Sequence, residues 1–205
     1  LEGAVEAETL HELDPATPLE DLRALYRYPD FNGFLKSFAE VGKRLRTPDD
    51  YALAARRMLE RLESQNVRYA EVILAAGVVL WKEREFGPVF DAVVEAAAES
   101  PVRTRWILDA VRQFGVDHAM KVAELAAERV GRGVAAFGIG GSEERGPAEW
   151  FPEVFAFARS AGLRLTAHAG ETGGPESIWA ALRLGGERIG HGIAAARDPD
   201  LMRHL

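Results

Sequence analysis

The sequence predicts an α/β fold, in which short β-strands alternate with α-helices and build a parallel sheet. Two observations predict this class. Five short apolar runs alternate with helical segments of about ten to fifteen residues, as in βαβ units. Histidine and glutamate follow two of these runs, and α/β barrels build their active sites at the carboxyl ends of strands. With 205 residues, the chain is long enough for one well-packed core.

The first part of the chain is predicted to be helical. Residues 17–20, Thr-Pro-Leu-Glu, have the pattern of a capping box with proline at the first helical position. Residues 47–50, Thr-Pro-Asp-Asp, predict another helix, because the helix dipole favours acidic side chains in a first turn. Between them, apolar residues at spacings of three and four form one helical stripe: Phe31, Phe34, Leu35 and Phe38. We interpret this stripe as a helix that packs on the core.

The rest of the chain alternates between the two kinds of element. The expected strands cover residues 69–74, 104–111, 134–139, 163–167 and 188–189. The expected helices cover residues 86–100, 116–130, 148–160 and 175–184. A closed barrel of this type needs eight strands and roughly 250 residues. We therefore expect part of a barrel with about five strands, in a single domain over residues 1–205 with an N-terminal helical insertion at about 8–46.

Both ends of the chain look cut. It begins at Leu1 without a methionine. It ends at Leu205, just after Asp198 and Pro199 open a new helix as its N-cap and its first helical residue. We expect the chain to be a portion of a longer protein.

Composition excludes several classes of protein. Lys and Arg total 25 against 32 Asp and Glu, and the resulting net charge of −7 argues against a nucleic-acid binder. The absence of cysteine excludes disulfides and thiolate metal sites, so any metal must be held by nitrogen and oxygen. No apolar run approaches the roughly 20 residues of a membrane span. We expect a cytoplasmic protein.

The strongest functional signal is the pair of segments His-Ala-Gly-Glu at residues 168–171 and Gly-His-Gly at residues 190–192. Each follows an expected strand, with a helix between them. Imidazole binds a metal or moves a proton near neutral pH, and a carboxylate acts as an acid or a base. Glycines beside the carboxylate allow the backbone to approach a ligand closely. We predict a metal-assisted hydrolytic site that contains His168, Glu171 and His191.

Two neighbouring segments carry weaker signals. The glycine-rich run at residues 137–143 ends a strand, where it can expose N–H groups to a ligand or simply make a turn. Its spacing fits neither a dinucleotide fingerprint nor a P-loop. The charge run at residues 143–145, Glu-Glu-Arg, is interpreted as exposed surface.

These segments together resemble the adenosine deaminase family. The shared order is Gly-Gly-Ser-Glu at residues 140–143, His-Ala-Gly-Glu at 168–171 and Gly-His-Gly at 190–192. Leu-Glu-Gly at residues 1–3 is similar to the end of the family's first-strand motif, and Tyr-Ala-Glu-Val at 69–72 is similar to its second strand. The resemblance runs across all 205 residues.

The resemblance implies a (β/α)8 TIM-type barrel of the metal-dependent hydrolase kind, present here in part, with one Zn2+ ion per subunit. It implies an enzyme that hydrolyses a C–N bond of a cyclic amidine, by deamination of adenosine or a related adenine nucleoside. In such an enzyme, His168 is a zinc ligand and Glu171 donates a proton to the purine ring. His191 positions and deprotonates the zinc-bound water.

The same resemblance implies substrate-binding positions. Gly141 matches the position whose backbone N–H contacts the base, and Glu2 matches an acidic position near the 5′ end of the sugar. Phe34 and Phe38 lie on a segment similar to the helix that closes the mouth of the pocket. We expect an adenine nucleoside as the small-molecule partner, and neither nucleic acid nor a membrane. The sequence carries no signal for an oligomeric state.

The sequence departs from the family pattern in several places. The family's His-x-His ligand pair would lie before Leu1, and its ligand Asp would lie beyond Leu205. Gly138 stands where the animal enzymes commonly have Asp, and residues 75–81, which end in Trp81, differ from the usual Ser-Pro turn. These departures motivate an alternative within the family, a deaminase of an adenine compound with an extended 5′ substituent such as aminodeoxyfutalosine.

Two further alternatives belong to other classes. The ligands that lie outside the chain motivate a truncated, non-catalytic barrel that binds purine nucleosides. A different metal hydrolase on the same barrel would hold two metals with a bridging carboxylated lysine. No lysine lies at the carboxyl end of an expected strand, which disfavours that hydrolase.

Overall fold

The chain forms two compact units in the computed structural model. The first unit comprises Leu1–Ala70 and Glu85–Thr104, and the second comprises Glu71–Arg84 and Arg105–Leu205. The predicted organisation as a single domain, with a helical insertion at about 8–46, stays a prediction.

The structure describes residues 1–205, apart from the side chains of Phe31, Asn32 and Leu35. Two members of the predicted apolar stripe, Phe31 and Leu35, therefore lie outside the described side chains.

The first unit is helical, as predicted for its N-terminal part. Its elements are the 3-10 helix η1 (Glu2–Ala4) and the helices α1 (Ala7–Leu13), α2 (Leu19–Ala24), α3 (Phe31–Arg44), α4 (Pro48–Ser64) and α6 (Phe86–Ala98). Helices α4 and α6 pack against each other. The first turn of α4 is closed by a capping box, in which Thr47 and Asp50 each accept a hydrogen bond from the other's backbone N–H.

The capping box predicted at residues 17–20 is wrong. Thr17 Oγ1 donates a hydrogen bond to Asp14 Oδ2 at 2.7 Å, and Pro18 is the N-cap of α2 without a capping side chain. The N-cap position of α2 is thus occupied by a residue whose side chain has no hydrogen-bond acceptor, and Thr17 lies one residue before it.

The second unit is built on a five-stranded sheet in chain order. The strands are β1 (Tyr69–Leu74), β2 (Arg103–Val111), β3 (Val134–Gly140), β4 (Arg164–Ala169) and β5 (Arg188–His191). β1 has the predicted bounds, and the ends of the other strands differ from the predicted ones by at most two residues. β2 pairs in parallel with β3, β3 with β4, and β4 with β5. Sequential parallel order with a helix after each strand is the order of a (β/α)8 barrel, so the fold is part of a TIM-type barrel.

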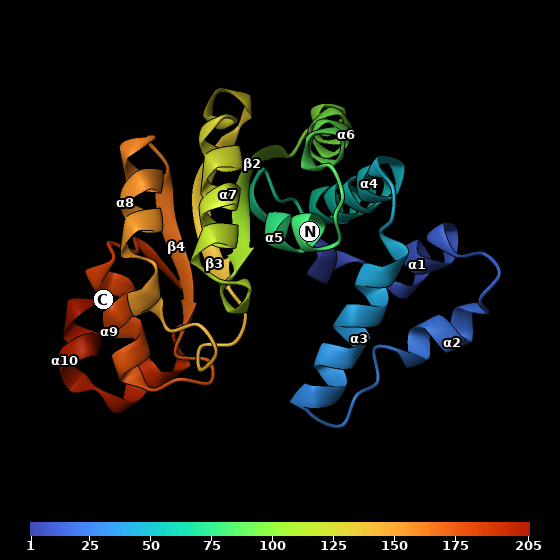
Figure 1. Cartoon of the computed structure of the whole chain (residues 1–205). Coiled ribbons are helices and arrows are strands. Elements are labelled where there is room, and N and C mark those ends of the chain that lie inside the picture. The colour runs from blue at the N-terminus through green and yellow to red at the C-terminus, as the bar shows by residue number, and fades with distance from the viewer. The chain divides into compact units, whose positions relative to one another are not determined.

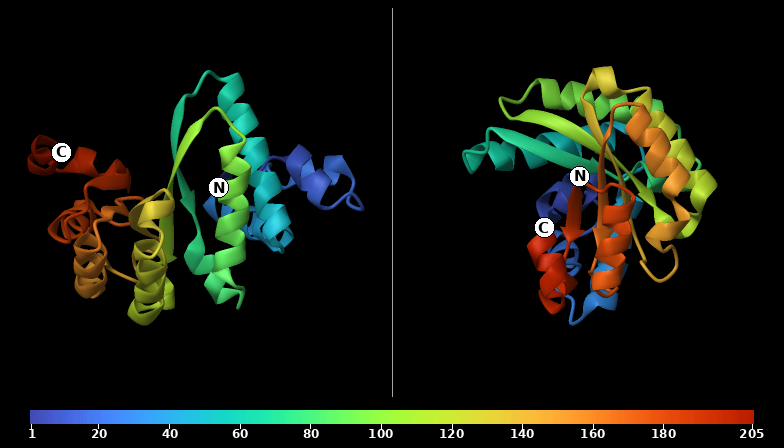
Figure 2. Two further views of the ribbon diagram at one scale, coloured as in Figure 1. Left: turned by 90° about the horizontal axis from the view of Figure 1, so that it is seen from above. Right: turned by 90° about the vertical axis from the view of Figure 1, so that its left-hand side faces the viewer.

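Helices cover one face of this sheet. The helices of this unit are α5 (Ala76–Trp81), α7 (Val116–Ala127), α8 (Pro152–Ser160), α9 (Pro175–Arg183) and α10 (Pro199–His204), of which α7, α8 and α9 pack on the strands. Figures 1 and 2 show α7 and α8 side by side on the same face, where α7 packs on β3 and α8 packs on β4. Phe137 of β3 contacts Phe155 of α8 edge-to-face, with ring centroids 5.6 Å apart. This apolar contact lies on the helix-covered face.

Alternation along β4 assigns its side chains to the two faces of the sheet. Leu165, Ala167 and Ala169 are buried under the helices, whereas Thr166 and His168 are only partly buried and point to the other face. The sequence therefore places His168 at the carboxyl end of a strand, on the face that lies inside a barrel.

None of the helices in the described part of the chain combines the length and apolar character needed to cross a membrane. The expected cytoplasmic location stays a prediction.

Candidate active site

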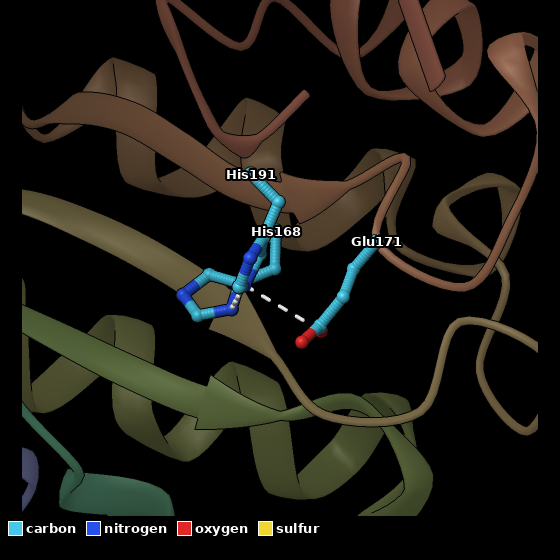
Figure 3. Close-up of side chains that lie close together, drawn as sticks. All are labelled: His168, Glu171 and His191. Atoms are coloured by element: carbon cyan, nitrogen blue, oxygen red, sulfur yellow. Dashed lines mark hydrogen bonds and ion pairs between the residues drawn. The ribbon is translucent and has the colours of Figure 1, made fainter. Parts of the chain in front are cut away.

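The structure brings together the three side chains that the sequence predicted to carry the chemistry. His168 lies near the end of β4, Glu171 in the loop that follows β4, and His191 at the end of β5. His191 Nε2 lies 3.2 Å from His168 Nδ1 and 3.5 Å from Glu171 Oε2. Figure 3 shows the three side chains pointing toward one another.

The pairing of β4 with β5 explains why the two imidazoles meet. His168 is opposite Gly190 and Ala169 is opposite His191 in the register of the two strands. Gly190 has no side chain, and a Cβ built there would lie 3.1 Å from His168 Cδ2, so the glycine leaves room for the ring. The ring centroids of His168 and His191 are 4.9 Å apart, with an interplanar angle of 69°.

His191 adopts a rare backbone conformation. Its φ is +66°, in the left-handed region, which residues with a side chain seldom occupy. Gly192 follows with φ +65°. Strained backbone of this kind clusters at functional sites, because the surrounding structure holds it there. The strand end therefore turns sharply at the residue whose imidazole faces His168 and Glu171.

The donor set fits a zinc ion. One ligand atom from each of His168, Glu171 and His191 can be chosen so that all lie within 4.8 Å of one another. Imidazole nitrogen is one of the ligands that zinc binds in proteins. His168 offers such a nitrogen, and the side chains of Glu171 and His191 lie beside it, where they can exchange protons with a water or a substrate.

His168 is set up as a neutral imidazole. Burial lowers its pKa most, and the neighbouring His191 and the Arg112 guanidinium lower it further, while Glu143 acts in the opposite direction. A neutral imidazole has a free lone pair, which is the form that binds a metal.

Glu143 is buried, and its interpretation as part of an exposed charge run is wrong. Only 6% of the residue is exposed. Its carboxylate lies under the loop that carries Glu171, where it accepts hydrogen bonds from the backbone. Burial raises the pKa of Glu143, but hydrogen bonds from Ser177 and from the amides of the loop outweigh burial and lower it to about 2.

Sequence reasoning missed Arg112, which follows β2. This residue is 1% exposed, and its Nη1 and Nη2 atoms donate to the carbonyl oxygens of Gly146 and His168 at 3.1 and 2.5 Å. Burial lowers the pKa of Arg112, while the carboxylates of Glu143, Asp109 and Glu149 raise it. The only feature of the sequence that pointed to Arg112 was its position directly after an expected strand.

Gly141 lies directly after β3, at the same end of the sheet as His168. Its φ of +92° suits glycine, and a Cβ there would lie 2.2 Å from Gln113 Oε1. Gln113 Oε1 accepts a hydrogen bond from the backbone N–H of Ser142 at 3.0 Å. The side-chain amide of Gln113 thus holds the end of β3, where the sequence predicts a contact with the purine base of the substrate.

The other three predicted substrate-binding residues belong to the first unit. Glu2 lies in η1 and is buried, and Phe34 and Phe38 lie on α3 with ring centroids 6.1 Å apart. A Cβ built at Gly3 would lie 3.9 Å from Phe38 Cε2, so α3 approaches η1. Glu2, Phe34 and Phe38 therefore belong to the same unit. Their contact with a substrate stays a prediction.

One layer below the histidines, the inner face of the sheet is polar. Asp109 of β2 is opposite Gly138 of β3 in the register. A Cβ at Gly138 would lie 2.6 Å from Asp109 Oδ1, so the glycine accommodates the carboxylate. Glu71 of β1 and Arg188 of β5 form an ion pair, although they belong to the first and last strands of the sheet. The sheet is therefore strongly curved, as a barrel wall is.

The arrangement can perform acid–base chemistry at one point. A carboxylate and two imidazoles converge where the carboxyl ends of β4 and β5 meet, which is the active-site end of a (β/α)8 barrel. Such groups can hold a metal ion, accept a proton from water and donate a proton to a substrate.

Comparison with known proteins finds relatives that are named as deaminases. An aminodeoxyfutalosine deaminase from Streptomyces avermitilis is 38% identical over 198 residues, which are 93% of this chain and 55% of that protein. An adenine deaminase from Chelativorans sp. is 35% identical over 185 residues, which are 88% of this chain and 57% of that protein. The chain thus spans about half the length of these relatives.

Solved structures show the same fold. The crystal structure of an adenine deaminase from Arthrobacter aurescens matches with a TM-score of 0.86 and 28% identity, over 100% of this chain and 66% of that one. A zinc-bound amidohydrolase from Burkholderia ambifaria matches with a TM-score of 0.87 and 28% identity, over 99% of this chain and 59% of that one.

The family model for adenosine deaminase matches residues 4–205. This match includes His168, Glu171 and His191, together with the loop that Glu143 holds. The chain therefore belongs to the adenosine deaminase family.

Proposed function

We propose that the protein is a zinc-dependent enzyme that deaminates adenosine or a related adenine nucleoside. Water supplies the oxygen: its O–C bond forms at the ring carbon that carries the amino group, and the C–N bond then breaks. Ammonia leaves with the transferred protons, and the 6-oxo product remains. The observation that supports this proposal best is the convergence of His168, Glu171 and His191 within hydrogen-bonding and metal-ligand distance.

Each of the three residues has a distinct role. His168, which is held neutral, contributes a nitrogen ligand to the metal. A zinc ion bound there would supply an activated water, because such an ion lowers the pKa of a bound water to about 7. His191 accepts a proton from the attacking water, and Glu171 donates a proton to the nitrogen of the purine ring. His191 Nε2 and Glu171 Oε2 are 3.5 Å apart, so the base and the acid flank one small space.

Substrate binding involves four further residues. The backbone N–H of Gly141 contacts the base, Glu2 binds near the 5′ end of the sugar, and Phe34 and Phe38 close the pocket. The position of Gly141 at the active-site end of β3 supports its role, and the roles of Glu2, Phe34 and Phe38 follow from the resemblance of their segments to the family.

A substrate panel separates the candidate substrates. The relatives carry the names adenine deaminase and aminodeoxyfutalosine deaminase, which makes adenine and aminodeoxyfutalosine the compounds to compare with adenosine. A strong preference for adenosine supports the proposed substrate. A strong preference for aminodeoxyfutalosine supports the alternative, and would agree with the small residue Gly138 at the inner face of the sheet.

The test uses the intact gene product. We expect stoichiometric zinc by elemental analysis and loss of the adenine absorbance with release of ammonia. In the variant Glu171→Gln the fold and the zinc stay, while turnover falls by roughly 10²-fold or more, the scale of general acid catalysis. Full activity in this variant contradicts the assigned role. An intact protein with neither zinc nor turnover supports instead a barrel that only binds nucleosides.

A further inference from the structure

We propose that Glu143 is a positioning residue, whose buried carboxylate holds the backbone of residues 170–173 so that Glu171 faces His191. This inference rests on the proposed deamination. It concerns a residue that does not touch the substrate and acts through the loop that follows β4.

The carboxylate of Glu143 accepts hydrogen bonds from four consecutive backbone N–H groups. Oε2 accepts from Gly170 at 2.8 Å. Oε1 accepts from Glu171 and Thr172 at 2.9 Å each, and from Gly173 at 3.3 Å. One side chain therefore satisfies every amide in the turn that carries Glu171.

The environment keeps this carboxylate charged. A buried carboxyl group without donors would take up a proton, because desolvation raises its pKa. Here the donors outweigh burial, and the pKa of Glu143 is about 2. Hydrogen bonds to a charged acceptor are roughly twice as strong as neutral ones, so the ionised form of Glu143 binds the turn most firmly.

The turn needs an external hold because of its composition. Gly170, Gly173 and Gly174 surround Glu171, and glycine has more backbone freedom to lose on ordering than any other residue. Gly170 lies at φ +71°, and a Cβ there would come within 2.5 Å of Ile178 Cδ1. The sequence therefore makes a tight turn possible without making it rigid, and Glu143 supplies the rigidity.

Arg112 connects the two segments from the other side. Its guanidinium donates to the carbonyl of His168, which begins the turn, and to the carbonyl of Gly146, in the loop that carries Glu143. A Cβ at Gly146 would lie 2.8 Å from the backbone of Arg112, so these segments are in close contact. Two buried side chains of opposite charge thus fix the carbonyl and the amides of the loop between β4 and α9.

The first test is the near-isosteric variant Glu143→Gln in the intact, zinc-loaded gene product. One carboxylate oxygen becomes an NH2 group, which faces backbone donors and cannot accept from them. A displacement of about 1 Å far from the chemistry can cost roughly 10²-fold. We expect kcat to fall by about 10- to 100-fold at unchanged KM and zinc content. The matched control is Glu144→Gln, at the exposed neighbouring residue, which leaves kcat unchanged.

A double variant separates positioning from general damage to the fold. If Glu143 acts through Glu171, then Glu143→Gln adds little once the acid is gone, because residues that act as a unit are not additive. We expect Glu143→Gln combined with Glu171→Gln to turn over within about 3-fold of Glu171→Gln alone. Losses that multiply would overturn the proposal.

Amide hydrogen exchange tests the hold without any turnover. We expect the amides of residues 170–173 to exchange at least about 10-fold faster in Glu143→Gln than in the parent or in Glu144→Gln. Unchanged exchange overturns the inference, even if the enzyme is active. If Glu143→Gln exchanges faster than the parent, but the parent does not deaminate any of the substrates, the result counts against the proposed function alone.

If Glu143→Gln does not fold, the variant Ser177→Ala provides a second test. Ser177 Oγ also accepts a hydrogen bond from Gly170, at 2.9 Å, so Ser177→Ala weakens the same turn more gently. We expect a loss of exchange protection at Gly170 with a smaller fall in kcat. Full protection and full kcat in Ser177→Ala would contradict the inference.

Discussion

His191 Nε2 lies 3.2 Å from His168 Nδ1, although 23 positions separate the two residues in the sequence. Two ring nitrogens at this distance cannot both carry a proton, since two N–H donors would then face each other. At least one of them presents a lone pair. The pair is therefore prepared either for a shared proton or for a metal ion, and a nearby carboxylate balances the charge of that ion.

Removing His168 should remove the metal. In His168→Ala we expect zinc content and turnover to fall together, because the imidazole whose pKa burial lowers is the proposed ligand on β4. The matched control is His204→Ala, at an exposed histidine on α10 whose ring contacts Trp179 in a tilted arrangement. Elemental analysis after dialysis measures the bound zinc. Full zinc content in His168→Ala would show that this residue is not a ligand.

The stability of the protein should depend on pH through Glu143. Its pKa is lowered from 4.5 to about 2 in the folded chain, so the ionised form is preferred in the fold. The resulting stabilisation is fully present above about pH 4.5 and is lost as the pH falls toward 2. A shift of this size corresponds to about 3 kcal/mol.

Urea unfolding of metal-free protein at several pH values between 6 and 2 measures this effect. We expect the free energy of unfolding of the parent to decline more steeply below about pH 4.5 than that of Glu143→Gln, which has no carboxyl group to titrate. Parallel curves for the two proteins would mean that Glu143 titrates normally in the fold.

The contrast between Glu143 and His168 shows what the sequence can predict. Strand ends were predicted to within two residues, and the three side chains predicted to share a site lie close together, because apolar alternation and short motifs are local signals. The burial of Glu143 was not predictable in this way. Its partners are backbone amides 27 to 30 positions away. Every residue except proline has such an amide, so the sequence does not indicate which ones a side chain will meet. A Glu-Glu-Arg run resembles solvated surface unless the loop above it is known.

The same limit applies to Arg112, whereas the error at Thr17 has a local cause. Arg112 donates to carbonyl oxygens of His168 and Gly146, 56 and 34 positions away, so nothing near it in the sequence indicates burial. Thr17 has the pattern of a helix cap, but a carboxylate three residues earlier binds its hydroxyl instead. Local patterns predicted the elements and the reactive groups, whereas long-range polar contacts that fix loops appeared only in the structure.

The turn after β4 should not tolerate a side chain at Gly170. In Gly170→Ala, the left-handed backbone costs about 1–2 kcal/mol. The overlap with Ile178 Cδ1, 2.5 Å from the added Cβ, costs about 1–3 kcal/mol more. We expect a lower midpoint of urea unfolding, together with a loss of turnover, because Glu171 is the next residue.

The control for this substitution is Gly131→Ala. Gly131 is exposed, and a Cβ there meets no atom within 4 Å. This variant should unfold within about 0.5 kcal/mol of the parent. Equal stability of Gly170→Ala and Gly131→Ala would mean that the turn after β4 can relax around a methyl group.

Gly138 and Asp109 should be energetically coupled, because the glycine makes room for the carboxylate. A Cβ at Gly138 would lie 2.6 Å from Asp109 Oδ1 and 2.9 Å from Thr166 Cγ2. We expect Gly138→Ala to destabilise the protein by about 1–3 kcal/mol, the usual cost of overpacking. Adding Asp109→Ala removes the first of these overlaps, so the double variant should lose less stability than the sum of the single ones. The interaction energy should amount to at least about 0.5 kcal/mol. Urea unfolding of the four proteins at one pH measures it, and strict additivity would mean that Asp109 moves aside without cost.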